Sequence, residues 1–383
     1  MRNRILRILI TALVLTAAIG LAPATPAMAA AGTIALSALT GTPGSTISVS
    51  GTGFTLGGTP SVVWGGTAIT AAGSVNATGA LIGCSFVVPS SAPRGTYTVG
   101  VITSGGDTTS NSQSFYVTPA VQLSIGSGYV GDQITLSGAG FAASSTVTIY
   151  FDGTTILTAT ASSVGGVSMV LTIPPATWGS HTIRGNDTLG DSSVATFVVS
   201  QRLTVTPTDA AVGTPLSITG RGFAASQAVT LLFDEVTAST TTTDGAGSFT
   251  IPSFAMPASA LGAHTLRAQD ASANTFSVSV NTARSFAINP ATGPIATKVT
   301  ATGTGFKASE TIALTFDGAP ATTSPVTADT KGSFTATFDV PAAAGGGCGA
   351  TMGLFPAADA PHARAVCATA CVRTTPIRTP DKK

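Results

Sequence analysis

The chain repeats one sequence pattern four times at nearly even intervals, and this repeat limits its possible folds more than any other feature. Each copy carries a Gly-Phe pair, and the pairs stand at Gly53-Phe54, Gly140-Phe141, Gly222-Phe223 and Gly305-Phe306. A proline follows each phenylalanine at an almost constant distance, at Pro89, Pro174, Pro257 and Pro341. Two landmarks in the same register indicate four copies of one structural unit.

Within each copy, apolar residues alternate with polar ones. In the second copy, Ile134 and Leu136 alternate with Thr135 and Ser137. A period of two indicates strands with one buried face and one wet face, and turn residues separate these runs at short intervals. We therefore predict an all-β fold, a tandem array of immunoglobulin-like β-sandwiches. The expected domains are copy one at 30–118, copy two at 119–200, copy three at 201–282 and copy four at 283–346.

The parts of the repeated pattern have structural explanations. Gly140 stands at a strand end, where a bulge or a close backbone approach needs a missing Cβ. Phe141 follows as an apolar residue that we expect to close one end of the sandwich. Asp152-Gly153 comes where a strand must turn, and Asp-Gly favours tight hairpins. The equivalent turn residues are Asp234 and Asp317, whereas copy one has Trp64-Gly65-Gly66 and no carboxylate.

Charge and composition exclude one class of function. Charged residues make up 9% of the chain, against about 25% in ordinary globular proteins. The net charge is +1, and no cluster of Lys and Arg is visible. Binding to nucleic acid needs several basic side chains on one face. We therefore predict no nucleic-acid partner.

The N-terminus has the layout of a secretory signal peptide, residues 1–29. Arg2, Arg4 and Arg7 precede an apolar run over 8–21, and Ala27-Met28-Ala29 forms a small-residue cleavage site. A retained N-terminal anchor is the alternative. No later segment offers about 18 continuous apolar residues, so no membrane span is expected after the signal peptide is removed. The mature chain is expected to be secreted, and it could stay associated with the cell surface.

The repeated motifs resemble those of the IPT/TIG family of immunoglobulin-like domains. The resemblance rests on the pattern SxTGxGF, VTLxFDG, GSFTxxxxVP and GxHT, and it covers about residues 32–346. It implies an extracellular spacer, adhesive or accessory module of the bacterial secreted or surface type. Family members that are transcription factors bind DNA through basic loops, which have no match here.

The pattern breaks off after Gly346. The remaining 347–383 carries Cys348, Cys367 and Cys371 without alternating strand residues, so we predict an irregular tail with a possible disulfide. One explanation is a natural cysteine-bearing tail, and the other is a shifted reading frame. The C-terminal strands of copy four are expected to be missing or altered. With a shifted frame, copy four would lack its last two strands, which would expose a sheet edge.

Few residues suggest chemistry. Cys84 lies in an apolar strand and is expected to be a buried or unpaired thiol. His181 and His264 occupy the position that Tyr97 holds in copy one, which favours a partly exposed ring with a polar tip over a proton donor. Three loop aspartates could ligate calcium, although solvated turns explain them more simply: Asp187, Asp191 and Asp270.

No catalytic motif is visible, and we predict no catalytic residue, cofactor or metal. The function expected is that of an exported, non-enzymatic spacer or adhesion protein, with a wall or matrix polysaccharide or another surface protein as its partner. The alternative is a carbohydrate-binding accessory protein of a secreted polysaccharide-degrading system. Sugar rings stack on flat aromatic side chains, so Trp64 and Trp178 are the candidate contacts.

Overall fold

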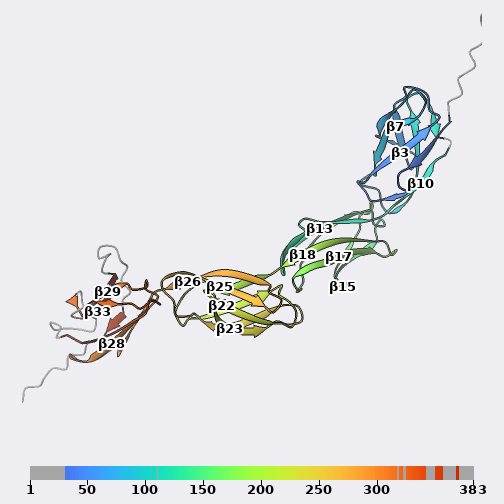
Figure 1. Cartoon of the computed structure of the whole chain (residues 1–383). Coiled ribbons are helices and arrows are strands. Elements are labelled where there is room, and N and C mark those ends of the chain that lie inside the picture. The colour runs from blue at the N-terminus through green and yellow to red at the C-terminus, as the bar shows by residue number, and fades with distance from the viewer. Residues whose placement is uncertain are drawn as a thin grey trace, which may run out of the picture. The chain divides into compact units, whose positions relative to one another are not determined.

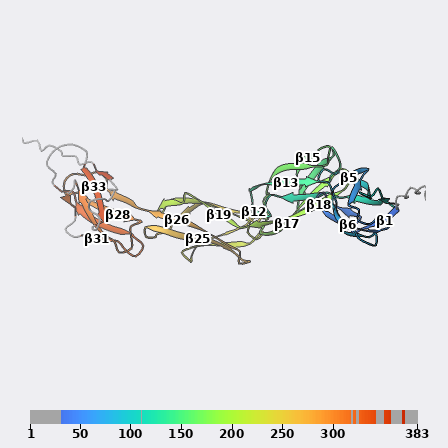
Figure 2. The same ribbon diagram turned by 90° about the horizontal axis from the view of Figure 1, so that it is seen from above.

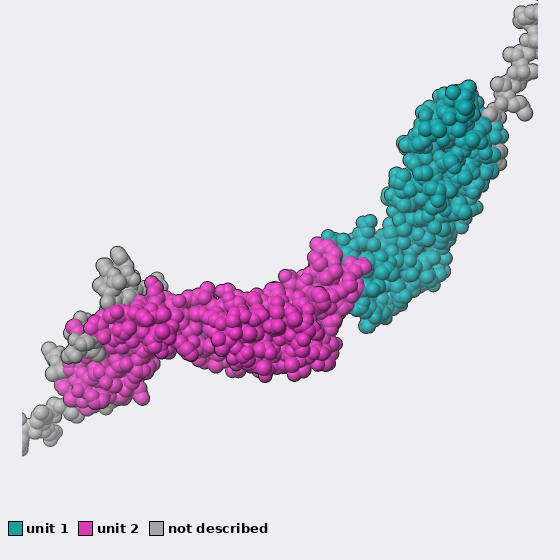
Figure 3. Space-filling view, viewed as in Figure 1, with its two compact units in different colours: residues 1–124, 135–171, 182–195 teal, residues 125–134, 172–181, 196–383 magenta. Residues whose placement is uncertain are grey.

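A computed structural model describes residues 31–109, 111–316, 319–321, 325–341, 350–356 and 368–370. The predicted signal peptide at 1–29 lies outside these residues, as do Asp317, Cys348, Cys367 and Cys371. Every regular element in the described part is a β-strand. The chain divides into two compact units, one of residues 1–124, 135–171 and 182–195, the other of 125–134, 172–181 and 196–383 (Figure 3).

Copy one forms a sheet in the order β2-β10-β8-β9-β1-β3-β7-β6, with β4 pairing to β5 and β8. The strands are β1 (Ala31–Leu36), β2 (Thr40–Gly41), β3 (Thr46–Thr52), β4 (Pro60–Trp64), β5 (Thr67–Ile69), β6 (Ala72–Val75), β7 (Leu81–Val87), β8 (Gly95–Thr103), β9 (Thr108–Thr109) and β10 (Gln113–Val117).

Copy two has a three-stranded sheet, β11-β13-β16, and a five-stranded sheet, β12-β18-β17-β14-β15. Its strands are β11 (Ala120–Leu123), β12 (Ser127–Tyr129), β13 (Gln133–Ala139), β14 (Thr146–Phe151), β15 (Thr154–Thr160), β16 (Val167–Thr172), β17 (Gly179–Asp187) and β18 (Ser192–Ser200).

Copy three repeats this arrangement as β19-β21-β24 and β20-β26-β25-β22-β23. In Figures 1 and 2 β25 and β26 run side by side. Its strands are β19 (Arg202–Thr206), β20 (Asp209–Ala211), β21 (Pro215–Arg221), β22 (Ala228–Phe233), β23 (Val236–Thr242), β24 (Phe249–Ala255), β25 (Gly262–Asp270) and β26 (Thr275–Ala283).

The cores follow from the alternation in the sequence. In β21, Leu216 and Ile218 are buried while Ser217 between them is exposed. In β22, which contributes to the opposite side of this core, Val229 and Leu231 are buried and Thr230 between them is half-buried. Side chains of a strand point alternately to its two faces, so a period of two places one set inside. The predicted all-β, immunoglobulin-like tandem fold is confirmed.

Copy four has two strands after Gly346, where the repeated sequence pattern breaks off. Its sheets are β27-β28-β32 and β30-β29-β33-β34, with β31 on β29. The strands are β27 (Ser285–Asn289), β28 (Lys298–Thr304), β29 (Thr311–Phe316), β30 (Ala319–Pro320), β31 (Val326–Thr327), β32 (Phe334–Asp339), β33 (Ala350–Pro356) and β34 (Ala368–Ala370).

The segment after Gly346 therefore forms β33 and β34, although its sequence lacks the alternating pattern that predicts strands. β33 pairs with β29 and β34 with β33, as β25 pairs with β22 and β26 with β25. The register puts Met352 opposite Phe316, the place of Leu266 opposite Phe233 in copy three. A ladder is made by backbone groups, so the pairing does not need the Gly-x-His-Thr signature whose loss suggested an irregular tail.

Candidate functional site

The Gly-Phe pair closes the same loop in all four copies. The phenylalanine N–H donates to the carbonyl of a later glycine, in the pairs Phe54–Gly79 (3.1 Å), Phe141–Gly165 (3.1 Å), Phe223–Gly247 (3.0 Å) and Phe306–Gly332 (3.0 Å). All four phenyl rings are buried. Each partner glycine has φ between 70 and 74°, a left-handed conformation that side chains with a Cβ rarely adopt.

These partner glycines were missed by the sequence reasoning. A Cβ on Gly247 would lie 1.9 Å from the carbonyl oxygen of Phe223, and one on Gly332 would lie 2.0 Å from that of Phe306. No side chain fits at such a distance, so the position requires glycine. The available signal was spacing, because each glycine follows its phenylalanine at a nearly constant distance along the chain.

Two of the three loop aspartates considered for calcium accept hydrogen bonds from backbone N–H groups. The first of them is Asp187. It is 3% exposed, and its carboxylate accepts hydrogen bonds from the N–H groups of Ala142 (3.0 Å), Leu189 (3.0 Å) and Asp191 (3.1 Å). These oxygens close the loop that follows the Gly-Phe pair. In the described part of the chain, no group of three or more His, Cys, Asp or Glu is placed to hold a metal.

Asp270 does the same in copy three. Its carboxylate accepts from the N–H groups of Ala224, Ser272 and Asn274, each at 2.9 Å. Burial raises the pKa of the Asp270 carboxyl, but the hydrogen bonds from Ala224, Asn274 and Ser272 outweigh it, so this pKa lies below its ordinary value. A carboxylate held in this way is a structural anchor.

The other two copies supply the carboxylate from different places. In copy one, Asp107 is completely buried and accepts from the N–H of Thr55 at 2.5 Å and from its hydroxyl at 2.7 Å. In copy four, Glu310 accepts from the N–H of Lys307 at 2.8 Å. Thr55 and Lys307 both follow the Gly-Phe pair, so a carboxylate binds this position in all four copies.

The aspartates of the Phe-Asp turns bind the neighbouring strand. Asp152 has φ of 46°, donates its N–H to the carbonyl of Thr182 (2.9 Å), and accepts from the Thr182 N–H through Oδ1 (2.8 Å). Asp234 repeats both bonds with Thr265, each at 2.9 Å. In copy one, Gly65 keeps only the backbone bond, to the carbonyl of Thr98 at 2.9 Å.

The equivalent residues Tyr97, His181 and His264 make the same contact in three copies. Tyr97 Oη donates to the carbonyl of Pro93 at 3.0 Å, and the Nε2 atoms of His181 and His264 lie 2.8 and 2.7 Å from the carbonyls of Thr177 and Ala260. Each partner is four residues earlier, so the ring ties down the loop before its strand. His264 also places Nδ1 at 2.6 Å from the carboxylate of Asp234.

The two tryptophans differ. Trp64 is 6% exposed and stacks on Tyr97 with ring centroids 4.6 Å apart, next to Phe86 and Phe115. Its indole is part of the core and has no face for a sugar ring, which corrects the expectation of a ligand contact there. Trp178 is 55% exposed. Its indole is therefore accessible to a ligand.

Cys84 is buried, and it is a free thiol within the described part of the chain. Burial raises the pKa of the Cys84 thiol, which disfavours the reactive thiolate. The side chain packs in the core of copy one. These facts describe a core residue with no access to a substrate.

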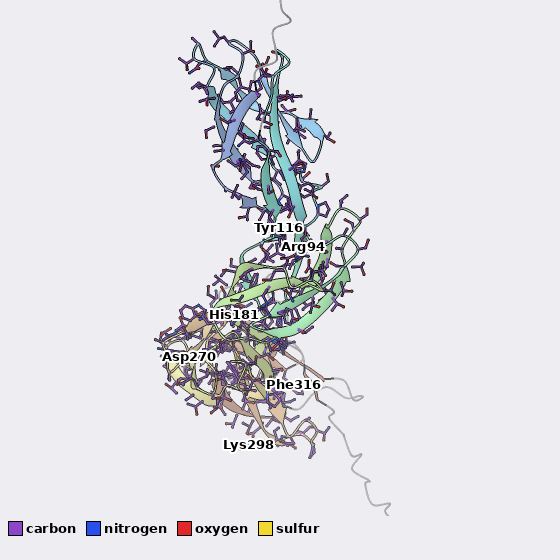
Figure 4. All side chains as sticks on the ribbon, turned by 90° about the vertical axis from the view of Figure 1, so that its right-hand side faces the viewer. Arg94, Tyr116, His181, Asp270, Lys298 and Phe316 are labelled. Atoms are coloured by element: carbon purple, nitrogen blue, oxygen red, sulfur yellow. The ribbon has the colours of Figure 1, made fainter. Side chains whose placement is uncertain are left out.

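Two of the Gly-Phe loops also accept a backbone hydrogen bond from the preceding copy. Within the first unit, the N–H of Arg94 donates to the carbonyl of Phe141 at 3.1 Å, and the Arg94 side chain forms an ion pair with Asp191. The Arg94 guanidinium lies 5.8 Å from the ring centroid of Tyr116, its neighbour in Figure 4. Within the second unit, the N–H of Leu261 donates to the carbonyl of Phe306 at 2.8 Å.

Two grooves in the second unit remain as candidate sites. The first is mainly apolar, and its lining includes Phe233, Val236, Phe254, Pro257, His264 and Lys331. The second is polar, and its lining includes Gly131, Asp132, Arg202, Thr204, Thr219 and Arg221. Among the described residues, no helix has the length and apolar character needed to cross a bilayer.

Several solved structures resemble this chain distantly. A tetra-tandem repeat from the extending region of a large adhesion protein is 20% identical over 85% of this chain and 95% of its own, with a TM-score of 0.24. The Bacteroides ovatus mixed-linkage glucan utilization locus protein SGBP-B, solved with a mixed-linkage heptasaccharide, is 14% identical over 85% and 91%, with a TM-score of 0.26. E. coli alpha-2-macroglobulin is 10% identical over 86% of this chain and 28% of its own, with a TM-score of 0.20. Likenesses this distant do not indicate a ligand.

The family comparison is specific. None of the curated proteins matches the chain. The model of the IPT/TIG domain family matches residues 119–196 and 283–354, and the second range extends into β33. The resemblance inferred from the Gly-Phe and Phe-Asp motifs is therefore confirmed at these two ranges, which fall in copies two and four.

Proposed function

We propose that this protein is an exported, non-enzymatic spacer and adhesion protein that acts at the cell surface or in the extracellular matrix. The observation that carries the proposal is that the buried carboxylates accept hydrogen bonds from the protein's own backbone. Asp107, Asp187 and Asp270 are buried and bind backbone N–H groups of the loop after the Gly-Phe pair. Acid–base catalysis needs a carboxylate that can reach a substrate proton, whereas these three stabilise the fold.

The signal-peptide pattern and the scarcity of charge support an extracellular role. A surface of hydroxyl and backbone polar groups suits weak contacts to polysaccharide or protein, and several weak contacts along one chain add up through multivalency. The partner class remains a matrix or wall polysaccharide or another surface protein.

The test compares cells that lack the chain with cells that carry it. Fractionation should find the mature chain outside the cytoplasm. Attachment to a polysaccharide-coated surface should fall in cells that lack the protein and recover when it is restored. Retention in the cytoplasm, or unchanged attachment, would contradict the proposal. Release of sugars from the coating by the purified chain would contradict the non-enzymatic assignment.

Trp178 favours a second candidate, a carbohydrate-binding accessory protein. A tryptophan that is 55% exposed presents apolar area to water, and aromatic rings are common contacts in ligand sites. Glycan binding that disappears in Trp178→Ala, with unchanged thermal stability, would support this role. Equal binding by the wild type and the variant would exclude Trp178 as the contact.

A further inference from the structure

Two arginines stand directly opposite each other in copy three. Arg202 of β19 and Arg221 of β21 are cross-strand partners in the antiparallel ladder, and both are exposed. Like charges at directly opposite positions destabilise a sheet. Only 17 of the 383 residues are Lys or Arg, so this pairing needs an explanation.

The fold does not require these arginines. The equivalent register position, between the strand that ends before each Gly-Phe pair and its neighbour, is uncharged in the other copies. The pairs there are Thr33–Thr52 in copy one, Ala120–Ala139 in copy two and Ser285–Thr304 in copy four. Only the copy-three pair is charged, and both of its residues carry the same sign.

Both arginines line the polar groove. Thr204 and Thr219 are also cross-strand partners, and they lie two residues from Arg202 and Arg221 along their strands. Alternation therefore puts all four on the outer face, while Leu203 on β19 points into the core. The groove thus offers two guanidinium groups and two hydroxyls from neighbouring strands.

The loop 130–132 forms another part of the lining, and both Tyr129 and Asp132 lie beside Arg202. The Arg202 guanidinium lies 5.4 Å from the ring centroid of Tyr129, which meets Phe276 edge to face at 6.4 Å. Asp132 places Oδ1 at 3.8 Å from Arg202 Nη1 and accepts from the Tyr129 N–H through Oδ2 at 2.8 Å. At 3.8 Å the Asp132–Arg202 pair is too long for a hydrogen bond, so donors of Arg202 remain for a ligand.

The loop backbone also comes close to Arg221. Gly131 has φ of 92°, and a Cβ built on it would lie 3.4 Å from Arg221 Nη1. Two arginines and Asp132 leave this groove with one net positive charge. That balance matches one monovalent anion.

We propose that this groove, which we call the Arg202–Arg221 groove, binds the carboxylate of an acidic saccharide of the hexuronate type. Guanidinium groups are planar forks that pair with carboxylates through two parallel hydrogen bonds. Thr204 and Thr219 can bind the sugar hydroxyls. The inference adds a ligand class to the proposed adhesive role and rests on that role only for the extracellular source of the ligand.

The experiment is calorimetric titration of the full exported chain with oligogalacturonate, its neutral methyl ester and inorganic phosphate. The variant Arg202→Ser/Arg221→Thr installs the pair found in copy four. A control, Lys298→Ser/Lys307→Ser, removes two exposed positive charges outside both candidate grooves. Arg221→Lys keeps the charge but loses the fork, and it provides a second test if the double variant does not fold.

We expect oligogalacturonate to bind the wild type and the lysine control alike, and to bind the groove variant about tenfold more weakly or worse. Arg221→Lys should bind with intermediate affinity, the methyl ester should not bind, and added salt should weaken binding. Equal binding by the groove variant, equal binding of the methyl ester, or tighter binding of phosphate would overturn the proposal. If uronate fails to bind while cell attachment still depends on the chain, the groove assignment falls and the adhesive role stands.

Discussion

Replacing Gly247 with alanine tests whether the Gly-Phe loop depends on its partner glycine. Gly247 has φ of 71°, and its carbonyl accepts the hydrogen bond from the N–H of Phe223 at 3.0 Å. A Cβ there would lie 1.9 Å from the Phe223 carbonyl oxygen, closer than any tolerated Cβ contact. The loop must therefore shift to make room, and the buried ring of Phe223 is attached to it.

The cost follows from two terms. A left-handed backbone costs a residue with a Cβ about 1–2 kcal/mol, and disturbing a hydrogen bond between buried backbone groups costs about 1–3 kcal/mol. Together they predict that Gly247→Ala lowers the unfolding free energy of copy three by about 2–5 kcal/mol. A tenfold change in an equilibrium constant corresponds to about 1.4 kcal/mol. The opening of copy three should therefore rise about 30-fold to about 4000-fold.

Hydrogen exchange measured peptide by peptide is the suitable assay, because it reports the local opening of each copy within the intact chain. Gly245→Ala is the matched control, since it lies in the same loop and a Cβ there meets nothing within 4 Å. Exchange in copy three should accelerate in Gly247→Ala and stay nearly unchanged in Gly245→Ala. Equal effects of the two substitutions would refute the steric argument.

Three further predictions follow from the anchors and the cores. The pKa of Asp270 is lower in the folded state, so its ionised carboxylate stabilises copy three fully above the unfolded pKa of about 3.9, and this stabilisation is lost as pH falls through the folded pKa. Hydrogen exchange in copy three should accelerate in that acid range. The variant Asp270→Asn should not show this acceleration. His264→Ala should destabilise copy three by about 1 kcal/mol, whereas His264→Tyr, which restores the copy-one residue Tyr97, should cost less in the same assay. Trp64→Ala should cost about 3–5 kcal/mol in copy one and Trp178→Ala less than about 0.5 kcal/mol by thermal denaturation; similar losses would contradict the difference in burial.

Most of the fold could be predicted because the repeat fixes the register of the pattern. Leu216 and Ile218 face inward as their alternation required. The strands after Gly346 could not be predicted in the same way. A ladder depends on backbone groups and on an available neighbour, here β29, and neither leaves a signature in the short run around Met352.

The candidate sites were less accessible to sequence reasoning. The burial of Trp64 was available from its own strand, since Val62 and Trp64 share a face and both are buried. The Arg202–Arg221 groove was not, because the two arginines are well separated along the chain and meet only through strand register. The domain boundaries, the signal peptide and the cysteine pairing stay predictions.

The backbone hydrogen bond from one copy to the Gly-Phe loop of the next has a consequence for how such a chain can gain or lose copies. The donor is a backbone N–H, of Arg94 in one case and of Leu261 in the other, and the acceptor is the backbone carbonyl of Phe141 or Phe306. Neither side chain takes part in that bond, so a joint of this kind does not need two matched residues to arise together. Where two copies meet in this way, duplication or loss of a copy still leaves a backbone donor and a backbone acceptor at the boundary.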